Sequence, residues 1–320
     1  MTSPLPHPAI PNPRTPSRQN PSQPQPSYLM FAQHGWADTN TDIQRWANAL
    51  ADTDAVVIAP NLGFWRTWWR MAPLVDEVDR IASTWHQRYP TRPKRIVGHS
   101  MGGLIWLEVL NRHPDWWPTV ERLSLVGSPV GGSDLGRILD PFGWGLGVAP
   151  DLGRNRRPLA EKIAQGIPTQ IVTSNFDGGS DGTVPLYCSR FRHAQYVELS
   201  GIPHDALKRH PFVARVVQHF WQNAPVVDSS QDLQIDIVIS QLQSVPGMTD
   251  AHERDFAKSH LWARLPNSLS LRTWVNPFGV HHVFLADRDN CCRFAGFVGW
   301  IHTAGLYQTL QAINVALTDE

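Results

Sequence analysis

The sequence has few cysteines, little charge and no long hydrophobic run, and each shortage excludes a class of protein. Only three of its 320 residues are cysteines, and two are adjacent, so we expect no disulfide framework and a reducing, cytoplasmic compartment. Charged residues make up 18% of the chain and cancel to a net charge of zero, which leaves no electrostatic footprint for a nucleic acid. No apolar run predicts a membrane span, and the N-terminus lacks the apolar core of a signal peptide.

The first 27 residues differ in composition from the remainder. They are rich in proline and serine and contain no acidic residue. Such a segment buries too little apolar surface to offset its ordering entropy, so residues 1–27 are predicted to be a disordered tail. Order is expected to begin at Tyr28.

From Tyr28 onward, short apolar runs alternate with helical patterns. The runs are rich in Val, Ile and Leu, which suits strands buried on both faces of a parallel sheet. The predicted strands are Tyr28–Gln33, Val56–Ala59, Arg95–Gly98, Leu123–Gly127, Gln170–Thr173 and Gln195–Leu199, and the predicted helices are Thr41–Leu50, Leu74–Trp85, Met101–Asn111 and Asp205–Trp221. This alternation predicts an α/β fold with a doubly wound, mostly parallel sheet over residues 28–222.

Two regions depart from the alternation. Residues 131–157 are rich in glycine and have little periodicity, so they are predicted to be a lid-like excursion over the sheet. Residues 223–320 are predicted to form a C-terminal α+β extension that packs on the first domain. The expected elements are strands at Ile235–Ser240, Leu269–Val275 and Val280–Leu285, and a final helix at Gly296–Leu317.

The strongest chemical signal is the motif Gly98-His99-Ser100-Met101-Gly102, which follows a predicted strand and opens a predicted helix. A serine in such a sharp turn is presented above the sheet, and the glycines leave room for the strained backbone. The backbone N–H of Met101 would then face the oxyanion that develops during attack on a carbonyl.

With its following glycine, this motif reads GHSMGG and resembles the nucleophile elbow of α/β hydrolases of the lipase and esterase branch. Phe31–Trp36 resembles the strand-HG segment of these enzymes, and Gly127–Ser133 resembles a loop of lipases and of PGAP1-like hydrolases. The resemblance implies that the backbone N–H of Trp36 is the second oxyanion donor. Family members usually have two strands before the HG segment. This chain lacks them, and the C-terminal extension is expected to cover the vacated sheet edge.

In this family the catalytic residues follow the order serine, acid, histidine. The acid commonly stands in the pattern Asp-Gly-x-Val-Pro, which matches Asp181, while Asp177 is the rival candidate. The histidine is expected in a loop after the next strand, which indicates His204. The resemblance thus implies a triad of Ser100, Asp181 and His204.

Substrate contacts are expected close to the oxyanion position. His34 and Gly35 in the strand-HG segment, and Trp144 in the glycine-rich excursion, are predicted to bind substrate. The segment Phe64–Arg70 contains three tryptophans, which either line an acyl pocket or contact an interface, or else pack between helix and sheet. A transient contact with a membrane surface is therefore left open.

These residues predict a serine hydrolase that cleaves a carboxylic ester with a hydrophobic acyl group through an acyl-enzyme. The expected partner is a small-molecule ester or a lipid, and the triad requires no metal or organic cofactor. A thioesterase or an acyltransferase would use the same triad. A non-catalytic binding or scaffold protein that keeps the fold is the alternative from another functional class.

Overall fold

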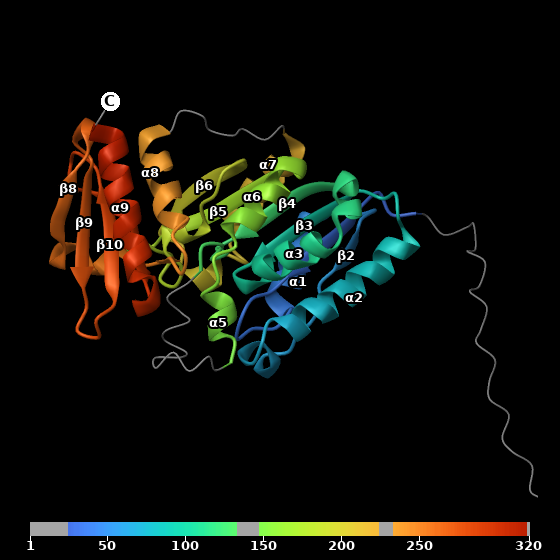
Figure 1. Ribbon diagram of the computed structural model, residues 1–320. Coiled ribbons are helices and arrows are strands. Elements are labelled where there is room, and N and C mark those ends of the chain that lie inside the picture. Colours follow the sequence, from blue (N-terminus) through green and yellow to red (C-terminus); the bar gives the residue numbers. More distant parts are fainter. Residues whose placement is uncertain (1–24, 133–146, 224–232, 319–320) are drawn as a thin grey trace, which may run out of the picture.

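The computed structural model describes residues 25–132, 147–223 and 233–318 (Figure 1). Its larger part is a parallel sheet of six strands in the order β2-β1-β3-β4-β5-β6. The strands are β1 (Leu29–Gln33), β2 (Val56–Ile58), β3 (Lys94–His99), β4 (Val120–Val126), β5 (Thr169–Asn175) and β6 (Ala194–Ser200). The prediction of a doubly wound, mostly parallel sheet is confirmed.

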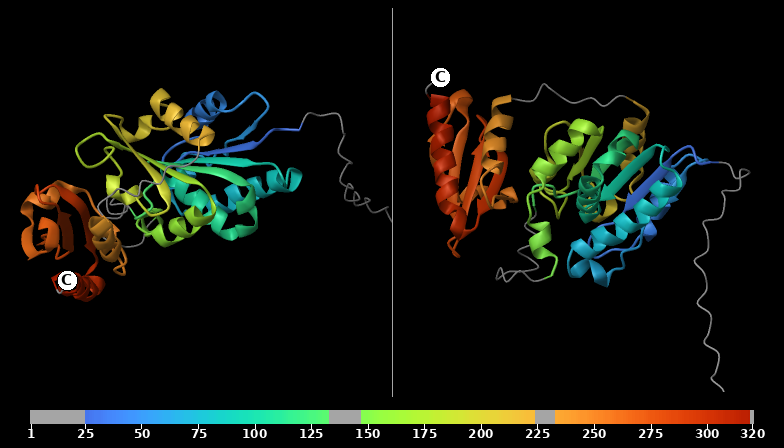
Figure 2. Two further views of the ribbon diagram at one scale, coloured as in Figure 1. Left: turned by 90° about the horizontal axis from the view of Figure 1, so that it is seen from above. Right: turned by 45° about the vertical axis from the view of Figure 1, so that its right-hand side comes forward.

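Helices cover both faces of this sheet (Figure 2). On one face, α1 and α7 contribute Ile43, Trp46, Val213 and Phe220 to an apolar core, and on the other α2, α3 and α6 form a second core. The helices of this part are α1 (Thr41–Leu50), α2 (Ala72–Arg88), α3 (Met101–Arg112), α5 (Ala149–Leu152), α6 (Arg157–Gly166) and α7 (Pro211–Gln222). Short 3-10 turns are η1 (Trp65–Trp68), η2 (Pro114–Thr119), η3 (Leu186–Ser189) and η4 (His204–Ala206).

Several sequence expectations about this part need comment. The helix expected over Asp205–Trp221 begins only at Pro211, because proline favours the first turn of a helix and residues 204–206 form η4. Helix α6 was not expected. Residues 1–24 of the expected tail and residues 133–146 of the expected lid lie outside the described residues, as does Trp144.

The C-terminal part forms a separate antiparallel sheet of five strands in the order β7-β11-β10-β9-β8. Helices α8 and α9 pack on one of its faces through a core that includes Val238, Leu242, Leu285 and Leu310. Its elements are α8 (Leu233–Gln243), β7 (Thr249–Asp250), η5 (Glu253–Lys258), β8 (His260–Arg264), η6 (Pro266–Ser268), β9 (Ser270–Val275), β10 (His281–Ala286), β11 (Cys292–Val298), η7 (Trp300–His302) and α9 (Thr303–Thr318).

Two expectations for this part are wrong. The strand expected at Ile235–Ser240 is helix α8, because Ile235, Val238, Ile239 and Leu242 recur at helical spacing and form one buried face. The helix expected over Gly296–Leu317 begins at Thr303, because the chain before it forms strand β11 and the turn η7. Within the described residues, none of the helices combines the length and the apolar character needed to cross a bilayer.

The second sheet lies beside β6, at the end of the first sheet opposite to β2 (Figures 1 and 2). The expectation that the C-terminal extension covers the edge left by the two missing strands is therefore wrong, since that edge is β2. Among the described residues, the polar contacts that join the two parts include Arg157 with Asp250, Asn155 with the carbonyl of Gln243, and Asp177 with His252.

The pair of Arg157 and Asp250 is almost completely buried between the two parts. The Arg157 guanidinium also donates hydrogen bonds to the carbonyl oxygens of Tyr187 and Arg190, at 2.8 and 2.9 Å. Asp250 opens the second sheet as part of β7, so this pair ties β7 to helix α6 and to the η3 segment of the first part.

Arg157→Met is expected to lower the free energy of unfolding by about 3 to 5 kcal/mol, because it leaves the buried carboxylate of Asp250 without its partner. Urea unfolding followed by tryptophan fluorescence measures this change. The matched control is Arg154→Met, whose exposed side chain lies 4.0 Å from Glu108 and should contribute no more than about 1 kcal/mol. Equal stability of the two variants would contradict the role given to the pair.

Candidate active site

Ser100 stands at the junction of β3 and α3 with a backbone that side chains rarely adopt, at φ 54° and ψ −129°. Neighbouring glycines make this turn possible. A Cβ atom on Gly102 would lie 2.3 Å from the carbonyl oxygen of Gln33, and one on Gly98 would lie 2.5 Å from the backbone of Gly103. The positions two residues before and two residues after Ser100 must therefore be glycines, since they lie directly against backbone atoms.

The structure brings Ser100, His204 and Asp181 together from three separate segments. His204 Nε2 lies 3.0 Å from Ser100 Oγ, and His204 Nδ1 lies 2.7 Å from Asp181 Oδ2. Asp181 is 2% exposed, and its other oxygen accepts hydrogen bonds from the backbone N–H groups of Thr183 and Val184. Three groups in this order form the arrangement in which a serine hydroxyl can pass its proton to an imidazole.

Asp177, the rival acid, points elsewhere. Its carboxylate accepts hydrogen bonds from the backbone and hydroxyl of Ser180, and it lies 3.5 Å from Nε2 of His252 in the C-terminal part. These contacts hold the pKa of Asp177 below its usual value, although partial burial opposes the shift. Asp177 thus belongs to the junction between the two parts.

The strand-HG segment lies directly against the serine. A Cβ atom on Gly35 would lie 2.8 Å from Cβ of Ser100 and 3.3 Å from its Oγ. Trp36 follows, and its ring contacts that of Trp68 at a centroid distance of 4.4 Å. The next N–H, that of Ala37, donates to Oγ1 of Thr67 at 2.9 Å. The segment around η1 therefore supports the loop that carries the predicted oxyanion donor Trp36, while Met101 opens α3 next to Ser100.

His34 does not have the role expected for it. Its side chain is completely buried, Nε2 accepts the N–H of Leu62, and Nδ1 donates to the carbonyl of Gly35, both at 3.0 Å. Burial lowers the pKa of His34, so the neutral ring holds this loop in place. The prediction that His34 contacts substrate is wrong, because both of its nitrogens bond to main-chain atoms. Gly35 remains a predicted substrate contact.

His99 contacts the main chain of His204 and holds it in place. It is buried, and its Nε2 lies 2.9 Å from the main-chain carbonyl of His204, to which it donates a hydrogen bond. Desolvation, and secondarily the nearby His204, hold the pKa of His99 well below 6.5. The ring is neutral and fixes the His204 loop together with the backbone bond from His204 N–H to the Asp181 carbonyl, at 2.8 Å.

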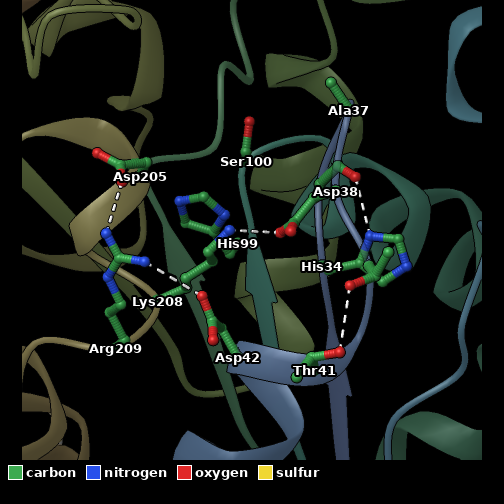
Figure 3. Close-up of polar contacts among 12 residues, drawn as sticks. His34, Ala37, Asp38, Thr41, Asp42, His99, Ser100, Asp205, Lys208 and Arg209 are labelled. Carbon is green, nitrogen blue, oxygen red and sulfur yellow. Dashed lines mark hydrogen bonds and ion pairs between the residues drawn. The ribbon is translucent and has the colours of Figure 1, made fainter. Parts of the chain in front are cut away.

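Sequence reasoning missed a group of ion pairs beside this site (Figure 3). Lys208 Nζ lies 2.6 Å from Asp38 Oδ2, which joins the His204 segment to the loop that follows Trp36. Arg209 bonds to Asp42 and to Asp205 on the more exposed side. No signal in the sequence indicates the pair of Lys208 and Asp38, because these residues are 170 positions apart.

Gly35→Ala is expected to lower kcat for an ester by about 100-fold, because the new methyl group would press on the Ser100 side chain and displace Oγ. Stopped-time hydrolysis assays with a p-nitrophenyl ester measure kcat. The control is Gly299→Ala, where a Cβ atom would meet nothing within 4 Å and the backbone has a φ of −68° that alanine adopts readily. Full activity of Gly35→Ala would show that the loop can move away from Ser100 without loss.

Stability is expected to fall as the pH is lowered below about 6.5, the unperturbed pKa of histidine. His34 and His99 both have a lowered pKa in the folded state. As the pH falls, the unfolded chain therefore binds protons at a higher pH than the folded chain does, which stabilises the unfolded state relative to the folded state. Each histidine contributes at most about 1.4 kcal/mol per pH unit until its folded pKa is reached. Denaturant titrations at pH 8, 7, 6 and 5 test this, and His99→Asn should show a shallower dependence on pH.

A family model described as serine aminopeptidase, S33, matches residues 24–135, about a third of the chain. No curated protein shows significant sequence similarity to the chain. The matched segment contains the strand-HG loop and the Ser100 elbow. Together with the geometry around Ser100, the match supports a serine hydrolase.

Solved structures with a similar fold include lipases, a carboxyl esterase and a thioesterase, all at low identity. The propeptide form of the lipase BlEst2 from Bacillus licheniformis has a TM-score of 0.51 at 12% identity, covering 86% of this chain and 72% of the lipase. The mature form of that lipase has a TM-score of 0.47 at 15% identity, covering 64% and 94%. Est1E from Butyrivibrio proteoclasticus, with ferulic acid bound, has a TM-score of 0.47 at 14% identity, covering 63% and 91%. The fold of this chain is that of the α/β hydrolases, with an additional antiparallel sheet at the C-terminus.

Proposed function

We propose that the protein is a serine hydrolase that cleaves carboxylic esters with a hydrophobic acyl group. The observation that carries the proposal is the unbroken hydrogen-bonded series from Ser100 Oγ through the His204 ring to Asp181, placed on a strained turn. A strained backbone at a polar, nearly buried serine needs a functional reason, because it costs stability.

In the proposed reaction, Ser100 Oγ attacks the ester carbonyl while His204 Nε2 takes its proton. The two atoms are already 3.0 Å apart, within reach for proton transfer. The carboxylate of Asp181 holds the proton on Nδ1 and stabilises the imidazolium that forms. His204 then gives its proton to the leaving alcohol, and a water molecule releases the acyl group by the reverse sequence.

The tetrahedral oxyanion would be held by the backbone N–H groups of Met101 and Trp36. Met101 is the first residue of α3, so its N–H is one of the unpaired donors at a helix N-terminus, where the helix dipole also favours negative charge. One such donor typically contributes about 3 kcal/mol to the transition state.

The preference for a hydrophobic acyl group rests on the aromatic side chains near the oxyanion loop. Trp36 adjoins Gly35, which touches Ser100, and Trp68 and Phe64 extend this apolar surface outward. A thioesterase or an acyltransferase would form the same acyl-enzyme and differ only in the leaving group or the acceptor, so these remain alternatives within the proposed chemistry.

A substrate panel tests the proposal. The wild-type protein is assayed with p-nitrophenyl esters from acetate to palmitate, with an acyl thioester, and with aminoacyl p-nitroanilides. We expect turnover of the esters that increases with acyl length. Faster cleavage of the anilides would instead assign an aminopeptidase, the activity named in the matching family model.

The alternative of a non-catalytic scaffold is tested separately with a fluorophosphonate probe. An activated serine is expected to be labelled in the native protein and not in Ser100→Ala. No labelling of the native protein would favour the scaffold.

A further inference from the structure

Four aromatic side chains beside the site form an exposed apolar surface. Trp65 and Trp69 are 76% and 73% exposed, and Phe64 and Trp68 complete the group. We name these residues the tryptophan patch. Side chains of this size are rarely left in water, so a cluster of them on one short segment indicates a surface that contacts something.

The tryptophan patch is held on an ordered base. Thr67, in the middle of η1, is completely buried, and its hydroxyl donates to the carbonyl of Phe64 at 2.7 Å and accepts the N–H of Ala37. Trp68 rests on Trp36. The turn thus holds the indole rings of Trp65 and Trp69 in solvent. The contacts of Thr67 with Ala37 and of Trp68 with Trp36 connect the patch to the oxyanion loop.

A second exposed apolar surface lies in the C-terminal part. Phe278, Trp300 and Ile301 are 79%, 71% and 87% exposed, and we name them the hairpin patch. Phe278 stands in the turn between β9 and β10, and the other two in η7. The turn is ordered, since Oδ1 of Asn276 accepts the N–H groups of Phe278 and Val280, and Trp300 Nε1 donates to the Phe278 carbonyl at 3.1 Å.

The two patches occur at the same end of the molecule although they come from different sheets. In Figure 1 and in the right panel of Figure 2, the β9–β10 turn and the start of α9 lie at the lower edge, and the segment before α2 lies at this edge as well. More than 200 positions of sequence separate the patches. A partner that contacts both must be extended and flat.

Acidic residues are scarce in the chain segments that carry Phe64–Trp69 and Phe278. The sequence has no acidic residue between Asp54 and Asp76, and none between Asp255 and Asp287. Two exposed arginines, Arg66 and Arg70, alternate with the tryptophans. The carboxylate of Asp151 lies close to this segment, where it accepts the N–H of Met71 at 2.8 Å. Exposed Trp and Phe with interspersed Arg match the interface of a bilayer with phosphate headgroups, where aromatic rings lie at headgroup level.

We propose that the protein docks on a phospholipid surface through the tryptophan patch and the hairpin patch together. Each patch alone would give weak binding, and two patches on one chain act as linked contacts to the same surface. Docking does not depend on catalysis. Its consequence does rest on the proposed function: the tryptophan patch would place the oxyanion loop against the membrane, so that an acyl chain reaches Ser100 directly from the lipid.

Co-flotation with vesicles tests the proposal. Vesicles of equal parts phosphatidylcholine and phosphatidylglycerol are mixed with the full chain carrying Ser100→Ala, so that no lipid is consumed. We compare this protein with two double variants in the same background, Trp65→Ser with Trp69→Ser and Phe278→Ser with Ile301→Ser, and with their combination. The matched control is Phe212→Ser with Leu261→Ser, which removes two half-exposed apolar side chains outside the patches.

We expect the parent protein and the control to float with the vesicles, each patch variant to bind at least about tenfold more weakly, and the combined variant to remain with the free protein. Pure phosphatidylcholine vesicles and high salt should both weaken binding, because the arginines lose their anionic partners. The proposal is overturned if the parent does not bind vesicles, or if the variants bind as the parent does. A change from dimer to monomer on gel filtration without loss of vesicle binding would assign the patches to a second copy of the chain.

Soluble-ester turnover, measured on the same variants with Ser100 restored, separates the two proposals. Retained turnover with lost vesicle binding supports docking. Vesicle binding by a protein without any ester turnover would leave docking intact and contradict the proposed function.

Discussion

Replacement of Ser100 by alanine is expected to lower kcat for a p-nitrophenyl ester by about 10⁴- to 10⁶-fold. The substitution removes the hydroxyl that His204 Nε2 contacts, and with it the proposed nucleophile. The loss corresponds to about 5 to 8 kcal/mol of transition-state stabilisation. Initial rates at saturating ester concentration measure the effect.

A matched control for this variant is Ser124→Ala. Ser124 is also buried, in the adjacent strand β4, and it should retain activity close to that of the wild type. Because Ser100→Ala keeps the same positive φ angle, its fold should be unchanged, and equal thermal unfolding of the two variants would verify this. A loss of less than about tenfold in Ser100→Ala would mean that the measured turnover arises elsewhere.

The second largest effect is expected for Asp181→Asn, a fall in kcat of about 10⁴-fold with little change in overall geometry. The reason lies in the contacts of Asp181. Oδ1 accepts the N–H groups of Thr183 and Val184, so an asparagine would keep its oxygen there and turn its NH₂ group toward His204. Nδ1 of His204 would then have to accept a hydrogen bond, which moves the ring proton to Nε2. A ring with this tautomer cannot take the proton of Ser100.

Asp177→Asn is the matched control, since Asp177 lies four residues earlier and is the other acid suggested by the sequence. Its carboxylate faces Ser180 and His252, so kcat should change by less than about threefold. If Asp177→Asn were the inactive variant and Asp181→Asn the active one, the roles proposed for the two carboxylates would be reversed. Measuring kcat and KM separately distinguishes a lost proton-transfer step from weaker substrate binding.

The elbow around Ser100 could be predicted from the sequence because its requirements are local. Gly98, Ser100 and Gly102 lie within five positions, and the steric limits of a strand-to-helix turn leave few alternatives there. The inner strands β1, β3 and β4 could be located for a similar reason, since a strand buried on both faces is rich in apolar residues.

The C-terminal part was harder to predict, because short apolar runs fit a buried strand and a buried helix equally well. Residues 235–240 show this ambiguity: their branched side chains favour a strand, while the spacing from Ile235 to Leu242 forms the buried face of α8. The chain from Gly296 to Leu317 shows the reverse problem, since an apolar strand and a helix follow each other with only a short turn between them.

The sequence by itself determined the positions along the chain of the strands of the first sheet, the nucleophile turn and the residue types of a triad, because each depends on sterics and polarity within a few positions. Only the tertiary structure decided which acid faces His204, that His34 is a buried support, that Lys208 meets Asp38, and that the second sheet lies beside β6. These features join residues far apart in the chain. Their contacts follow from how whole elements pack, and no local rule restricts that packing to one outcome.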